Sequence, residues 1–251
     1  MTKDEKNDYL KKLELTLKCI NEIYKQYQDK EYSLSMESRM SFDIFDKIIH
    51  IFEYDGLPTI LKDKEYEKIK TIELYRGVKR FTSMVDFLTN KSYHSGMGYI
   101  NGIFASVYYS TAATYTENFL EHEENEDKIL KFKISLNSGI TYERLFDIRG
   151  LFAYPDFYKG KTITNKAVKE KLEILQEFTN NLPKIEKERF IKCLGQDESK
   201  LAIILGYNYV LDDSKENENN FIILNRSIVK TSESELNRFE SRAKADEYYS
   251  K

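Results

Sequence analysis

The sequence contains few cysteines, few histidines and no long apolar run, and each absence excludes a class of protein. Only two cysteines occur in 251 residues, Cys19 and Cys193, so neither a disulfide framework nor a zinc ribbon can form. The three histidines stand alone without metal-ligand spacing, and we expect no metal centre. The apolar run at 201–205 is among the longest, yet it is far too short to cross a bilayer.

An excess of charge of either sign is also missing. The 39 Lys and Arg nearly balance the 42 Asp and Glu, so a broad basic face for duplex nucleic acid is not expected. With 41% hydrophobic residues, a chain of this length can bury the core of one domain, with or without an appendage. The first residues are charged and lack the apolar run of a signal peptide. We therefore expect a cytoplasmic protein with no membrane partner.

Residues 1–70 are expected to form a helical region. Apolar side chains recur there at three- and four-residue steps, which is typical of an amphipathic helix; they are Leu10, Leu13, Leu17, Ile20, Tyr24 and Tyr27. Ser41 is a candidate N-cap for a second helix that carries Phe42, Phe45, Ile48, Ile49 and Phe52 on one side. We expect this region to recognise a target or a partner.

Short strand-like runs begin at residue 72 and alternate with helical segments, which predicts an α+β fold. The expected strands are 72–78, 102–109, 129–136, 207–213 and 219–230. The polar segment between the last two is expected to be a hairpin loop. A helix over 199–205 would end at Gly206, a favourable C-cap residue. These patterns divide the chain into 1–70, a core domain over 71–231 and a charged helical tail over 232–251.

Four segments of the core domain stand in a particular order. Arg76-Gly77 ends the first strand, and a glycine-rich segment from Gly96 leads into the strand Gly102-Ile103-Phe104-Ala105-Ser106. A helix that opens at Ser110-Thr111 carries Tyr115, and a late strand ends in the run from Phe221 to Arg226. Each segment alone is common in proteins; their order is more specific.

In this order the segments resemble the ADP-ribosyltransferase superfamily, above all its phage-associated and toxin-type mono-ADP-ribosyltransferases. The resemblance covers about residues 70–230 and implies a split mixed or antiparallel β core surrounded by helices. It also implies that NAD is a substrate, and no Rossmann fingerprint is present that would indicate a hydride carrier.

Arg76 and Gly77 take the first roles that the resemblance implies. Arg76 would contact the phosphates or the ribose of NAD, for which the forked guanidinium is suited. Gly77 would offer its backbone to the nicotinamide amide, where a Cβ would hinder close approach. Without the resemblance, an isolated arginine is most simply read as a surface residue.

The other binding residues lie in the second and third segments. The resemblance implies that Phe104 and Ser106 line the nicotinamide pocket and that Tyr115 stacks on the nicotinamide ring. Asn101 and Gly102 would shape the loop before the strand. Aromatic residues and serines at such positions otherwise belong to cores, turns and caps, so the order of the segments carries the functional reading.

The catalytic acid is where the sequence departs from the family pattern. The family places a glutamate at the start of the late strand, but here that position falls on Asn219, Asn220 or Phe221. A carboxylate there stabilises the positive charge that grows as nicotinamide leaves. We favour Glu218 as the catalytic acid, with Glu198 as the second choice; otherwise both are solvated loop charges.

The resemblance implies an NAD-dependent mono-ADP-ribosyltransferase that acts on a protein or RNA acceptor. A bacterial toxin or phage-conflict effector would fit, as part of a toxin–antitoxin or antiviral defense system with a neutralising antitoxin. Two alternatives stay open. The first is an NAD glycohydrolase that uses water as acceptor. The second is a catalytically degenerate protein of this fold, which would serve as a binding module or a phage structural component.

Overall fold

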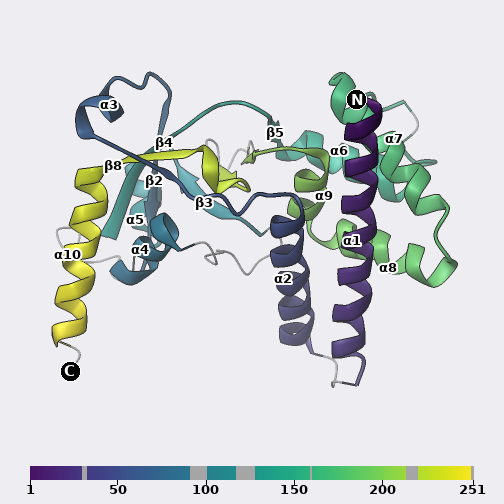
Figure 1. The fold of residues 1–251 in the computed structure, drawn as a ribbon, viewed down its shortest axis with the longest axis horizontal. Coiled ribbons are helices and arrows are strands. Elements are labelled where there is room, and N and C mark those ends of the chain that lie inside the picture. Colours follow the sequence, from purple (N-terminus) through teal and green to yellow (C-terminus); the bar gives the residue numbers. More distant parts are fainter. Residues whose placement is uncertain (30–32, 91–100, 117–127, 159, 213–219, 250–251) are drawn as a thin grey trace.

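The computed structural model describes residues 1–29, 33–90, 101–116, 128–158, 160–212 and 220–249. Within these residues the chain is α+β, with ten α-helices and a mixed, open sheet of eight strands (Figure 1). The helices form two groups, with α1, α2 and α6–α9 towards one end of the sheet and α3–α5 and α10 towards the other (Figure 1). The predicted α+β class is therefore confirmed.

The sheet has the strand order β1-β8-β4-β2-β3-β7-β6-β5. Its strands are β1 (Thr59–Leu61), β2 (Ile72–Gly77), β3 (Ile103–Ser106), β4 (Ile129–Ile134), β5 (Gly139–Thr141), β6 (Tyr209–Asp212), β7 (Asn220–Ile223) and β8 (Val229–Ser232). The pairs β1–β8 and β5–β6 are parallel, and the other neighbours are antiparallel. Strands distant in sequence are thus neighbours, which brings the segments noted above together.

One hydrophobic core joins the N-terminal helices to the second half of the chain. The helices that share it are α1 (Lys3–Tyr27), α2 (Leu34–Ile51), α6 (Tyr142–Ala153), α7 (Lys166–Asn180), α8 (Lys184–Gln196) and α9 (Glu198–Leu205). The predicted stripe of α1 supplies Leu13 and Ile20, both fully buried. Residues 1–70 are therefore packed into the fold and also supply β1, which pairs with β8.

The second core lies under the other part of the sheet. It is covered by α4 (Phe81–Thr89) and α10 (Glu233–Tyr249), with α5 (Tyr109–Ala113) and α3 (Asp63–Glu67) nearby. The charged tail predicted over 232–251 forms α10, and Phe239 in it is fully buried against α4. Strand β7 belongs to both cores, because Ile222 packs in the first while Phe221 and Ile223 pack in the second.

Several predicted elements have different bounds in the structure. The second helix begins after Ser33, which caps it by accepting from Met36 N, and not at Ser41. The single strand predicted over 219–230 is replaced, from Asn220 onward, by two strands, β7 and β8, separated by the 3-10 helix η2 (Arg226–Ile228). Strands β1 and β5 and helix α6 were not predicted. By contrast, the predicted end of the helix over 199–205 is confirmed. Gly206 is the C-cap residue of α9, and its backbone is left-handed (φ 94°).

Candidate active site

The sheet splits between β2 and β3, and this split creates the candidate site. The two strands pair at one position, Tyr75 opposite Ser106. By contrast, β2 pairs with β4 at six positions and β3 pairs with β7 at four. Beyond Tyr75 and Ser106, the backbones of Arg76-Gly77 and Phe104-Ala105 are therefore not paired with one another.

A cavity of about 370 Å³ lies at this split. Five of the residues predicted to bind NAD line it together, and they are Arg76, Gly77, Phe104, Ser106 and Tyr115. They come from β2, from β3 and from the turn after α5, which the tertiary fold brings together. The volume lies at the lower end of the range of ligand pockets, about 300–1,000 Å³.

Arg76 bridges the split. Its side chain is largely buried, and Nη1 donates to the Phe104 carbonyl at 2.7 Å. The guanidinium carbon lies 5.7 Å from the centre of the Phe87 ring, within reach of a cation–π contact. Arg76 is thus held in a fixed position on the cavity wall, as a residue that orients an anion needs to be.

Gly77 is required by the close packing of α5 on β2. A Cβ built on Gly77 would lie 2.0 Å from the Ala112 carbonyl oxygen. Any side chain there would push α5, and with it Tyr115, away from the strand. The need for glycine at this position therefore has a structural cause in the apo protein, whatever the backbone of Gly77 does towards a ligand.

Aromatic rings lie at the mouth of the cavity. Phe104 is 37% exposed and Tyr115 is 56% exposed, although both line the cavity. Exposed aromatic faces next to a cavity are suited to stacking on a planar ligand. Ser106 lies deeper, and its Oγ accepts from Tyr108 N at 3.1 Å.

Asn101 and Gly102 do not line this cavity; they fix the start of β3. Asn101 Nδ2 donates to Asp197 Oδ2 at 2.6 Å, and Ser199 Oγ donates to the Asn101 carbonyl. Gly102 has φ +150°, and a Cβ there would lie 2.6 Å from Ile222 Cγ2. The structure thus places both residues at the start of β3, where Asn101 anchors the strand to α9, and not on the described wall of the cavity.

Glu198 also lies away from the cavity. It is buried in the first turn of α9, and its carboxylate pairs with Arg149 Nη1. Burial raises the pKa of Glu198, and Arg149 opposes this rise. The structure thus places the second-choice acid in an ion pair between α6 and α9, apart from the residues at the split.

Asn220 is one of the three residues, with Asn219 and Phe221, at which the resemblance would place an acid. It is the first residue of β7, pairs with Ser106 and lines the cavity. Glu218, two residues earlier, lies outside the described residues, as do residues 96–100 of the glycine-rich segment. Sequence reasoning did not select several other lining residues, among them Lys79 and Ser83. Lys79 could have been found, since it follows Arg76-Gly77-Val78 directly.

The described side chains of the cavity wall carry positive charge. Among the described residues that line it, Arg76 and Lys79 are cations and none is a carboxylate. An anionic ligand such as a pyrophosphate would be attracted to such a wall.

Known proteins offer no guide to this site. No protein-family model, curated protein or solved structure matches the chain.

Among the described residues, no group of histidine, cysteine and carboxylate side chains could hold a metal ion. No described helix is both long enough and apolar enough to span a membrane.

A substitution at Glu198 tests its structural role. Glu198→Gln is expected to lower the free energy of unfolding by about 1–3 kcal/mol, because it leaves Arg149 without its carboxylate. Urea unfolding measures this change. The double variant with Arg149→Gln should recover part of the loss. Any NAD turnover per folded molecule should stay at the wild-type value, and a large loss of turnover would place Glu198 in the chemistry.

Proposed function

We propose that the protein is an NAD-dependent mono-ADP-ribosyltransferase. The observation that carries the proposal is that Arg76, Gly77, Phe104, Ser106 and Tyr115, selected from the order of the sequence segments, line one cavity. The positive wall and the exposed aromatic rings add chemistry that fits a dinucleotide.

The residues have complementary roles in this proposal. Arg76 holds the phosphates or the ribose of NAD from the cavity wall, and Tyr115 stacks on the nicotinamide ring. The bond between nicotinamide nitrogen and ribose C1′ breaks, and nicotinamide leaves with the electron pair. The ribose then carries oxocarbenium character, as in glycoside hydrolysis.

The second half of the reaction completes the transfer. A hydroxyl or amine of the acceptor adds its electron pair to C1′ and gives its proton to a base or to solvent. Glu218 is the carboxylate that we assign to stabilise the cation, since it stands two residues before Asn220 at the cavity. The acceptor is a protein or an RNA, and a toxin or phage-conflict role with a neutralising antitoxin fits this activity.

Incubation of the purified protein with NAD tests the proposal. We expect nicotinamide release, measured by chromatography, and a gain in mass equal to ADP-ribose on the protein itself or on protein or RNA from a cell lysate. Release with only free ADP-ribose would instead identify an NAD glycohydrolase. No release, even with lysate present, would leave a binding module or phage structural protein, for which the asparagine at residue 220 is the supporting observation.

A further inference from the structure

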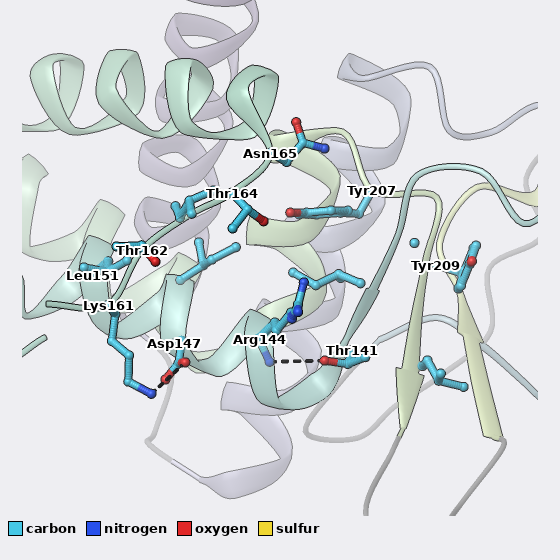
Figure 2. A pocket seen from close by; sticks show the side chains of 15 residues that line it. Thr141, Arg144, Asp147, Leu151, Lys161, Thr162, Thr164, Asn165, Tyr207 and Tyr209 are labelled. Atoms are coloured by element: carbon cyan, nitrogen blue, oxygen red, sulfur yellow. Dashed lines mark hydrogen bonds and ion pairs between the residues drawn. The ribbon is translucent and has the colours of Figure 1, made fainter.

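A second and larger cavity lies elsewhere in the fold. It has a volume of about 740 Å³ and is formed by β5, β6, α6 and the segment that leads into α7 (Figure 2). It shares no lining residue with the cavity at the β2–β3 split. Nothing in the proposed reaction uses it, so its chemistry can be considered separately.

Arg144 supplies a positive charge to this cavity. Thr141 caps α6 by accepting from Arg144 N at 3.4 Å, which places Arg144 in the first turn of the helix. Figure 2 shows its side chain rising from the helix towards Tyr207. Within the described part of the chain, the guanidinium makes no hydrogen bond and no ion pair.

The other charges that line the cavity cancel. Lys161 Nζ and Asp147 Oδ2 form an ion pair at 2.8 Å, visible in Figure 2. Among the described lining residues, Arg144 is thus the charge that remains without a counter-ion. The cavity therefore favours a ligand with one negative group.

Tyr207 is the strongest sign that a ligand belongs here. Its side chain is 7% exposed and lines the cavity, and its hydroxyl has no partner among the residues that the structure describes. The ring lies across the cavity with its hydroxyl towards Thr164 (Figure 2). Burial raises the pKa of Tyr207 to about 12, so the hydroxyl is a neutral donor near pH 7. The hydroxyl is not among the described side-chain atoms that are fully buried without a partner, so it is open to the cavity and can donate to a bound anion.

The start of α7 adds a favourable field. Asn165 caps this 15-residue helix by accepting from Ala167 N at 3.0 Å and Val168 N at 3.3 Å. Those amides are therefore satisfied within the protein, and the helix contributes only the positive end of its dipole.

The remaining walls are mostly apolar and aromatic. Ile148, Leu151 and Ile163 line the cavity beside the ring of Tyr209. That ring packs on Gly139, where a Cβ would lie 2.1 Å from a ring carbon. The glycine thus allows the ring to lie against the backbone. Such walls suit an apolar or planar ligand body.

We propose that this cavity binds a small organic anion, with an apolar or planar body between the aliphatic and tyrosine side chains. Its single phosphate or carboxylate group accepts from Arg144 and from the Tyr207 hydroxyl. This site is separate from the proposed NAD cavity and does not depend on the proposed reaction.

Calorimetric titration of the full chain tests the site with three probes. AMP carries a phosphate on a planar body, indole-3-acetate carries a carboxylate, and adenosine is neutral. We expect at least one anionic probe to bind at millimolar concentration or below, and adenosine to bind more weakly than AMP. Comparison of AMP with indole-3-acetate distinguishes a phosphate from a carboxylate ligand.

Variants tie the binding to the cavity. Arg144→Gln should weaken binding of the anionic probe by about tenfold or more, and Tyr207→Phe by a few-fold, because each loses one donor to a charged group. Arg39→Gln changes an exposed arginine on α2 and should have no effect. Thermal melting of each variant shows that it is folded. Equal binding by wild type and Arg144→Gln, or no binding of either anionic probe, would overturn the proposal.

Discussion

Replacing Glu218 by glutamine is expected to lower the kcat for nicotinamide release by about 100- to 1,000-fold. A carboxylate next to the ribose stabilises positive charge that is present in the transition state and almost absent in bound NAD. Its removal therefore lowers kcat much more than it weakens NAD binding. Steady-state kinetics with NAD, in which kcat and KM are separated, measures the effect.

Glu216→Gln is the matched control for this experiment, because it removes the same charge two residues away in the same segment. It should leave kcat within a few-fold of the wild type. If Glu216→Gln rather than Glu218→Gln abolishes release, the assignment of the acid is wrong but the proposed reaction survives. If both variants keep full activity, the reaction does not use a carboxylate from this segment.

Arg76→Ala is expected to lower kcat/KM for NAD by about 10- to 100-fold, because a charge-assisted hydrogen bond to the phosphates or ribose is lost. The change also removes the bridge from Nη1 to the Phe104 carbonyl across the sheet split. Part of the loss can therefore come from a displaced β3. Kinetics and a thermal melt on the same preparation separate the two contributions.

Two further variants sharpen the test of Arg76. Arg76→Lys keeps the charge without the planar fork, and it should recover only part of the activity. Arg80→Ala removes an exposed arginine at the start of α4 and should change nothing. An Arg76→Ala protein with wild-type kinetics and melting temperature would argue against NAD binding at the split.

Local signals explain which elements could be predicted. Helix α9 follows from an apolar run that ends at Gly206, and β2 and β4 follow from runs of β-branched and aromatic residues. Strand β5 was missed because it has three residues and because its one neighbour among the described strands is β6, which is distant in sequence. Helix α6 was missed because its apolar stripe is weak and it contains Gly150, which packs on the Tyr158 ring.

The part of the site that could be predicted consists of residues that belong to the ordered sequence segments. Arg76 and Phe104 belong to segments whose order carries the resemblance, and the fold brings them within hydrogen-bond distance of each other. The partnership of Asn101 with Asp197 could not be predicted, since 96 residues separate them. The larger cavity could not be predicted from a sequence motif. Its walls come from two segments, 139–165 and 207–211, which precede and follow α7 and α8 in the sequence.

The position of β7 has a consequence for how the protein is made. β7 is the common neighbour of β3 and β6 and packs in both cores, yet six of the other described strands precede it in the chain. A nascent chain that has not passed residue 223 leaves β3 and β6 without this neighbour and the cavity without Asn220. Domains of most proteins can begin to fold on the ribosome from their N-terminal side. Here the proposed activity would arise only after residue 223 has been translated and β7 has paired with β3 and β6.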